Sequence, residues 1–164
     1  MRDIVLVVHN VRSAHNVGSL LRTADGLGVS RVILSGYTPY PAGGKDERLP
    51  HIAAKVDRQI AKTSLGAEKT VHWERADELS GLAESLEADG YTVAALEQTE
   101  DSLNLNEFEP PEKVALIVGN EVKGLDERTL GLASVKVEIP MFGQKESFNV
   151  AVAAAMALYH LRFS

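Results

Sequence analysis

The strongest constraint on the fold is the alternation, along the chain, of short runs rich in valine and isoleucine with segments of helical periodicity. The apolar runs are predicted strands at residues 4–8, 31–35, 70–73, 91–96, 114–118 and 135–139. Helical patterns occur at about residues 14–27, 52–63, 76–88, 126–132 and 147–162. This alternation predicts an α/β fold with a mostly parallel sheet flanked by helices.

Length and composition limit the classes of protein that remain. The 164 residues are the size of one ordinary domain, and we expect residues 1–164 to form it. Cysteine is absent, which excludes disulfides and cysteinyl metal sites. No apolar run approaches the roughly 20 residues of a membrane span, and the start MRDIVLVVHN lacks the features of a signal peptide. We therefore expect a cytoplasmic protein without a membrane partner.

The charges are unevenly distributed. The net charge of -6 argues against a protein that coats nucleic acid by charge alone. Residues 1–75, however, carry eleven Lys/Arg and seven Asp/Glu, whereas residues 76–164 carry six and sixteen. A basic half joined to an acidic half permits one anion-binding face. A chance difference between two solvated surfaces would give the same composition.

Common nucleotide and metal signatures are missing. No GxGxxG motif follows a strand, and GNEVKG at residues 119–124 lacks the Lys-Ser/Thr pair of a phosphate-binding P-loop. The five histidines have no paired spacing suited to zinc. Kinases and typical dehydrogenases are therefore disfavoured, and we expect no metal.

Ligands of parallel sheets bind at the carboxyl ends of the strands, so the turns after Leu96, Val118 and Ile139 are the candidate positions. The first polar segment lies on the predicted helix that begins near residue 14, where Asn16 and Arg22 are nearly two turns apart. The planar guanidinium of Arg22 suits a phosphate. An amphipathic helix with a solvated arginine is the alternative.

Two further segments carry polar residues. Gly119 permits close approach of backbone to a ligand and precedes Glu121, although an ordinary glycine turn has the same composition. In residues 139–159, Ser147 suits an N-cap, and Phe148 and the residues from Val150 onward are expected to pack inward. Because this helix is apolar on nearly every side, we expect a partner subunit to cover part of it.

Taken together, the three segments resemble the SpoU/TrmH-type RNA 2'-O-ribose methyltransferases of the SPOUT superfamily. The matching residues are Asn10, Asn16, Gly18, Arg22, Thr23 and Ala24, then Gly119 to Leu125, then Ile139 to Met141 with Ser147 to Asn149. The motifs occur in the order of the family and span most of the chain.

The resemblance implies a C-terminal deep trefoil knot, a homodimer formed through the knot region, and S-adenosyl-L-methionine as methyl donor with no metal. The implied cofactor contacts are Leu96, Gly119, Ile139, Ser147 and Phe148, the last standing where relatives often have leucine. The implied catalytic residues are Arg22, Asn16, Glu121, Ser147 and Asn149. Arginine is always protonated in proteins, so we expect Arg22 to clamp phosphate and hydroxyl groups rather than to act as a base. In a dimer, we expect Arg22 to serve the site of the other subunit.

The resemblance also implies an RNA partner, with tRNA preferred and rRNA as the alternative. Many relatives carry an RNA-binding extension before the knotted domain, and we expect none here because the first strand begins at Ile4. RNA contacts are then predicted from Arg12, Lys45, Arg48, Lys55, Arg58 and Lys62. A knotted methyltransferase that modifies a base, and a non-catalytic RNA-binding factor, are the competing interpretations.

Overall fold

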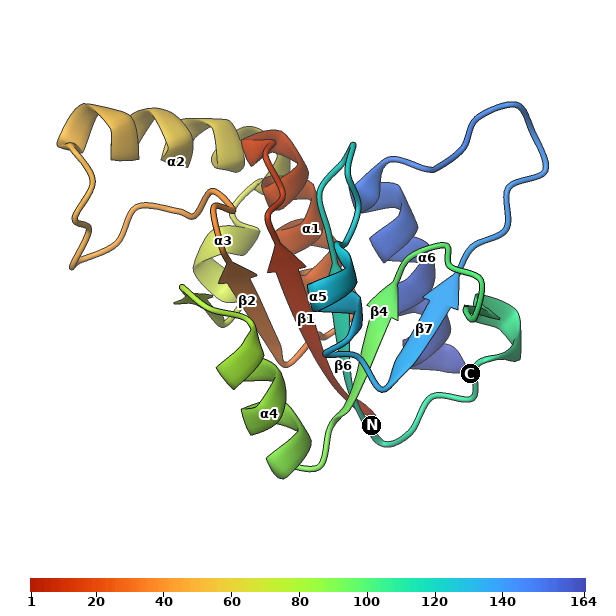
Figure 1. The fold of residues 1–164 in the computed structure, drawn as a ribbon. Helices are drawn as coiled ribbons and strands as arrows, with labels where there is room; N and C mark the ends of the chain where they lie inside the picture. The colour runs from red at the N-terminus through yellow and green to blue at the C-terminus, as the bar shows by residue number, and fades with distance from the viewer.

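One seven-stranded sheet forms the centre of the molecule in the computed structural model, which describes residues 1–164 (Figure 1). The strands are β1 (Asp3–His9), β2 (Arg31–Ser35), β3 (Trp73–Ala76), β4 (Thr92–Leu96), β5 (Leu103–Asn104), β6 (Lys113–Val118) and β7 (Val135–Glu138). Their order is β3-β2-β1-β6-β4-β7-β5, and all six pairings are parallel. The predicted α/β architecture with a parallel sheet is confirmed.

Helices cover both faces of the sheet. They are α1 (Ala14–Gly26), α2 (Pro50–Ser64), α3 (Ala67–Thr70), α4 (Ser80–Ala88), α5 (Glu127–Leu130) and α6 (Val150–Phe163), with a 3-10 turn at Leu105–Glu107. In Figure 1, α1 and α6 lie behind the sheet and α4 and α5 in front, whereas α2 extends beyond the carboxyl ends of the strands. None of the helices combines the length and apolar character that crossing a membrane requires.

The core has two layers because the side chains of a strand alternate between the faces of the sheet. In β1, Ile4, Leu6 and Val8 join the larger apolar cluster, which contains the buried faces of α1 and α6. Val5 and Val7 join the smaller cluster under α4 on the other face. Both sets are completely buried. The uninterrupted apolar run in the sequence therefore reflects a central strand that is covered on both sides.

The predicted strand at residues 70–73 is wrong. Residues 67–70 form α3, and the strand lies at Trp73–Ala76, so the helix predicted from residue 76 begins only at Ser80. β3 pairs with β2 alone, and an edge strand accommodates charged side chains such as Glu74 and Arg75. The two-residue β5 is too short to produce a periodic signal and was not predicted.

Helices α1 and α2 approach each other closely at Gly18. A Cβ atom at this position would lie 2.1 Å from Thr63 Oγ1 and 2.3 Å from the Ile60 carbonyl oxygen. The carbonyl belongs to helical backbone and cannot rotate away. Gly18 therefore permits the contact between these two helices.

We predict that Gly18→Ala lowers the free energy of unfolding by about 1–3 kcal/mol, because the added methyl group overpacks the helix contact. Gly26→Ala, on the same helix, is the matched control, since a Cβ there meets nothing within 4 Å. That change should be neutral or stabilising by up to about 1 kcal/mol. Urea denaturation measures both, and equal stability of Gly18→Ala and wild type would contradict the close packing.

Candidate functional site

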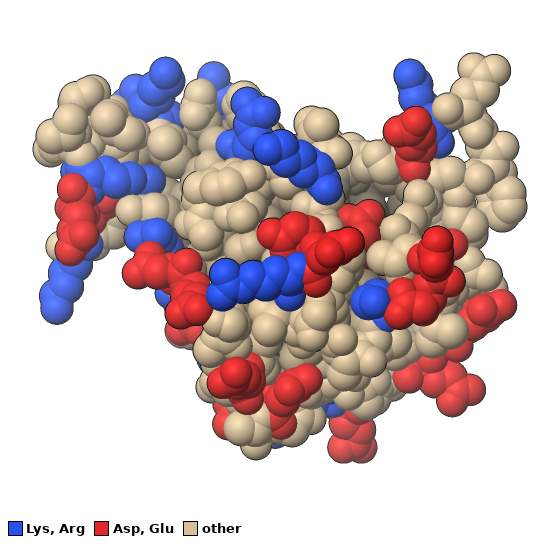
Figure 2. Space-filling view, viewed as in Figure 1, with Lys and Arg blue, Asp and Glu red and all other residues tan.

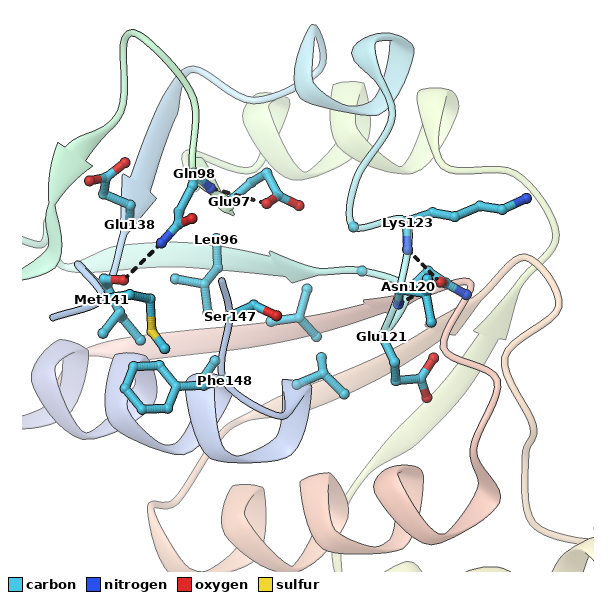
Figure 3. Close-up of a pocket in the computed structure, with 17 residues that line it drawn as sticks. Leu96, Glu97, Gln98, Asn120, Glu121, Lys123, Glu138, Met141, Ser147 and Phe148 are labelled. Carbon is cyan, nitrogen blue, oxygen red and sulfur yellow. Dashed lines mark hydrogen bonds between the residues drawn. The ribbon is translucent and has the colours of Figure 1, made fainter. Parts of the chain in front are cut away.

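A cavity opens at the carboxyl ends of β4, β6 and β7 (Figure 3). All five residues predicted to contact a cofactor line this cavity, namely Leu96, Gly119, Ile139, Ser147 and Phe148. Leu96 ends β4, whereas Gly119 and Ile139 immediately follow β6 and β7. Because the strands are parallel, their ends meet at one edge of the sheet. The three turns singled out in the sequence therefore surround one space.

The cavity wall is partly apolar and partly acidic. Its apolar residues include Val118, Ile139, Met141, Phe148 and Val150, and its carboxylates are Glu97, Glu121 and Glu138. In Figure 3, Met141 and Phe148 lie at one end of the cavity and Glu121 lies at the other. Such a wall suits a ligand that combines apolar or aromatic parts with positive charge. Phe148 was expected to pack into the core, but its residue is 40% exposed and borders the cavity instead.

Glu121 connects the end of β6 with the start of α1. Its carboxylate accepts hydrogen bonds from Arg12 N–H at 3.0 Å, from Ser13 N–H at 2.9 Å and from the Asn16 amide nitrogen at 3.1 Å. Ser13 is the N-cap of α1. The carboxylate thus supplies acceptors to N–H groups at a helix N-terminus, where negative charge is favourable.

These hydrogen bonds favour the ionised form of Glu121. Burial would raise its pKa, but the hydrogen bonds donated by the Arg12 and Ser13 backbones and by Asn16 outweigh burial and hold the pKa below the ordinary value of 4.5. Glu121 is therefore ionised at neutral pH. A carboxylate with a lowered pKa is a weak base, so its chemistry here is that of an acceptor that orients other groups.

Asn149 connects the third segment to the same network. Its amide nitrogen donates to Asn16 Oδ1 at 3.2 Å, and its own Oδ1 accepts from Ala151 N–H at 2.9 Å. Asn149 is thus the N-cap of α6, which begins at Val150. The expectation that Ser147 caps this helix, and that the helix begins near residue 147, is wrong. Both residue types suit an N-cap, but the helix begins at Val150, which makes Asn149 the capping residue.

Two residues of the site were assigned no role from the sequence: Glu97 lies outside the motif segments, whereas Asn120 lies within the matched segment Gly119 to Leu125. Glu97 follows β4 and accepts from Leu125 N–H at 2.9 Å and Gln98 N–H at 3.1 Å. A Cβ at Gly124, whose φ is +65°, would lie 2.1 Å from Glu97 Oε2. Asn120, only 8% exposed, accepts from the N–H groups of Val122 and Lys123, both at 2.9 Å. The loop after β6 is thus held from both sides. A polar residue directly after a buried strand was the available clue.

Arg22 is not part of the cavity wall of its own chain. Its side chain is exposed on α1, and it follows Asn16 by six residues, or about 9 Å along a helix axis. No hydrogen bond or ion pair of this guanidinium occurs within the chain. Asn16, Glu121 and Asn149 therefore form a cluster that does not include Arg22.

The side chains of the predicted RNA-binding residues differ in whether they are exposed or engaged in contacts within the chain. Arg12, Lys45, Lys55, Arg58 and Lys62 are exposed. Arg48 is instead engaged within its own loop, where it pairs with Asp46 at 2.6 Å and lies 3.6 Å from the centre of the Tyr40 ring. On the face shown in Figure 2, basic side chains gather over α2 and the adjoining upper end, and acidic side chains predominate elsewhere.

A family model and individual relatives all relate this chain to RNA methylases. The model of the SpoU rRNA Methylase family matches residues 3–159. A tRNA (guanosine(18)-2'-O)-methyltransferase of Thermus thermophilus is 31% identical over 96% of this chain and 73% of its own length. A 23S rRNA (guanosine(2553)-2'-O)-methyltransferase of Bacillus subtilis is 32% identical over 96% of this chain and 57% of its own length.

Solved structures are similar in fold. The crystal structure of the TrmH/SpoU tRNA modifying enzyme of Aquifex aeolicus superposes with a TM-score of 0.79 at 26% identity. The superposition covers 99% of this chain and 75% of the other. The whole sheet and its covering helices are therefore common to both.

The Glu121 network generates a pH prediction. Because the pKa of Glu121 is lower in the folded protein than its ordinary value of 4.5, the ionised carboxylate stabilises the fold at pH values above 4.5. This contribution to stability is lost as the pH falls through the lower pKa of the folded protein. We predict that Glu121→Gln lowers the free energy of unfolding at pH 7 by about 1 kcal/mol, a value reduced for partial exposure. In thermal melts, the difference in stability between Glu121→Gln and wild type should become smaller below pH 4.5. Glu146→Gln, at an exposed loop position, should show no such gap.

Proposed function

Because this chain belongs to the SpoU rRNA Methylase family, we infer that it is an RNA methyltransferase that modifies a ribose 2'-hydroxyl. The methyl donor in this proposal is S-adenosyl-L-methionine. The observation that carries it is the joining of three distant motif segments, through Glu121, Asn16 and Asn149, beside one cavity. A non-catalytic RNA-binding factor would have no need of a cavity with this lining.

The cavity residues fit the proposed donor. S-adenosyl-L-methionine, when bound, supplies a methyl group on a positively charged sulfur. The apolar wall that includes Leu96, Ile139 and Phe148 would hold its aromatic base, and the carboxylates of Glu97 and Glu138 favour its cationic groups. The backbone at Gly119 and Ile139, at the ends of parallel strands, supplies hydrogen-bonding groups at the rim.

Asn16 is the residue best suited to orient the acceptor ribose. Its amide nitrogen is fixed by Glu121 and its amide oxygen by Asn149, so the side chain cannot rotate freely. Methyl transfer to oxygen proceeds in line, and alignment of the acceptor hydroxyl is therefore a large part of the catalysis. Ser147 lies on the cavity wall, and Asn149 caps α6 and so fixes the start of that helix beside Asn16.

The proton of the hydroxyl must leave as the new bond to carbon forms. Glu121 is a weak base because its pKa is lowered, and an arginine is always protonated. We therefore assign the proton to an RNA phosphate or to water. Arg22 then acts as a clamp that holds phosphate and hydroxyl oxygens with its planar donors.

A homodimer would bring Arg22 to a cavity. An exposed apolar stripe runs along α6. It consists of Val152, Tyr159 and Phe163, which are 49%, 62% and 66% exposed. The helix α1, which carries Arg22, packs beside α6. We propose that two chains pair through this stripe and that Arg22 of one chain serves the cavity of the other. The deep trefoil knot implied by the family resemblance belongs to the same proposal.

The proposed RNA surface begins at α2. Lys55, Arg58 and Lys62 follow one another at helical spacings of three and four residues, so their side chains form one exposed basic ridge. Lys and Arg side chains neutralise the phosphates of nucleic acids. Transfer RNA is the first candidate substrate and ribosomal RNA the second, since a tRNA enzyme of T. thermophilus and an rRNA enzyme of B. subtilis both match over 96% of this chain.

The first test is methyl transfer to unmodified RNA. The protein is incubated with S-adenosyl-L-methionine labelled in its methyl group and with transcribed tRNA or 23S rRNA, and the labelled RNA is hydrolysed in alkali. Alkaline cleavage requires a free 2'-hydroxyl, so ribose methylation is expected to leave the label in alkali-resistant dinucleotides. Label in mononucleotides would instead identify a base methyltransferase. Absence of both transfer and donor binding would leave the non-catalytic interpretation.

The second test concerns sharing of the site between subunits. Arg22→Ala and Asn149→Ala homodimers should each lose at least about 100-fold in kcat, since each lacks one part of every site. Mixed dimers of the two variants should recover activity, because one of their two sites then has both residues. Recovery to no more than the level of the parents would contradict a shared site. Dimer formation itself is checked by analytical ultracentrifugation.

A further inference from the structure

Tyr37 is an exposed aromatic residue held beside the candidate site. It follows β2 in the chain, and 58% of its surface is exposed. Its hydroxyl oxygen nevertheless accepts a hydrogen bond from the Asn120 amide nitrogen at 3.0 Å. Asn120 directly precedes Glu121 and lines the cavity. The ring is therefore exposed to solvent at a position that adjoins the cluster of Asn16, Glu121 and Asn149.

The backbone of Tyr37 is held as firmly as its hydroxyl. Its N–H donates to Asn10 Oδ1 at 3.0 Å. Asn10 itself adopts a left-handed conformation with φ of +53°. At Gly36, with φ of +64°, a Cβ would lie 1.9 Å from Asn10 Oδ1, so this turn depends on glycine. On the other side, the buried Thr38 donates its hydroxyl to the Val8 carbonyl oxygen at 2.9 Å.

The Asn120 side chain, which donates the hydrogen bond to the Tyr37 hydroxyl, has little conformational freedom. Its amide nitrogen donates to the Asn10 carbonyl oxygen at 3.1 Å as well as to Tyr37, and its amide oxygen accepts from two backbone N–H groups. A side chain with all these partners is fixed. The Tyr37 ring is thus anchored at both ends, and little conformational entropy remains to be lost when something packs against it.

An anchored, exposed ring beside a ribose-modifying site has a specific chemical use. Proteins recognise single-stranded RNA by stacking unpaired bases on aromatic side chains. We propose that Tyr37 is a stacking platform for a nucleobase of the RNA substrate at or next to the methylated nucleotide. The exposed Arg12, two residues after Asn10, is positioned to contact the accompanying phosphate. This inference rests on the proposed RNA-modifying function and adds a base contact to the phosphate contacts of α2.

The test separates the ring from its hydroxyl. Tyr37→Ala removes both, whereas the matched variant Tyr37→Phe removes only the hydroxyl bonded to Asn120. Binding of labelled oligoadenylate and oligouridylate of about twelve nucleotides is measured by fluorescence anisotropy at low salt. Adenine offers the larger stacking surface, so wild type should bind oligoadenylate more tightly. Tyr37→Ala should weaken that binding by about fivefold or more and reduce the preference, and Tyr37→Phe should stay within about twofold.

Arg58→Ala provides the electrostatic control, because loss of a phosphate contact should weaken both oligonucleotides equally. The proposal is overturned if wild type shows no oligoadenylate preference, if Tyr37→Ala binds as tightly as wild type, or if Tyr37→Phe loses as much as Tyr37→Ala. The last result would assign the effect to the Asn120 contact instead of stacking. Calorimetry with S-adenosyl-L-methionine distinguishes the two proposals, since absence of donor binding to wild type counts against the methyltransferase function and not against stacking.

Discussion

The hydrogen bonds of the Glu121 carboxylate are the interaction on which the site depends. They join the loop after β6 to the first residues of α1, and Asn16 extends the connection to the N-cap of α6. Each member satisfies polar groups of another segment, so removing one breaks the hydrogen bonds that join these segments. This arrangement accounts for polar residues at the mouth of an otherwise apolar helix. Asn149 caps α6 and fixes Asn16 at the same time.

The parallel sheet makes this network possible. β6 is the sixth strand in the chain, yet it lies in the sheet between β1 and β4. Its carboxyl end therefore adjoins the carboxyl end of β1, where α1 begins, and also faces the end of β4, where Glu97 holds the far side of the loop. Glycine at position 124 permits that second attachment, because Glu97 occupies the space of a side chain. Tyr37 adds a third, polar attachment through Asn120.

Local patterns predicted the buried elements well and the polar details poorly. The strand at residues 31–35 and the helix from residue 14 follow from apolar periodicity, and they occur at those positions. The N-cap of α6 was assigned to Ser147, but the helix begins at Val150 and Asn149 caps it while also bonding Asn16; serine and asparagine are both suitable caps, so their residue types do not distinguish them. The contacts of Arg48 with Tyr40 and Asp46 within its loop had no signal in the sequence, and its predicted contact with RNA stays a prediction. Glu97 and Tyr37 belong to no recognised pattern, and Asn120, although it lies within a matched motif, was assigned no role.

The sequence by itself determined the α/β class, the strand ends at which a ligand would bind and the three motif segments, because periodicity and turn residues act between neighbours in the chain. Only the tertiary structure decided which polar groups meet. Asn16 bonds to residues 105 and 133 positions away, and such contacts depend on strand order rather than on local preference. The same holds for the separation of Arg22 from the cavity and for the anchoring of Tyr37, since both follow from where whole helices and loops lie around the sheet.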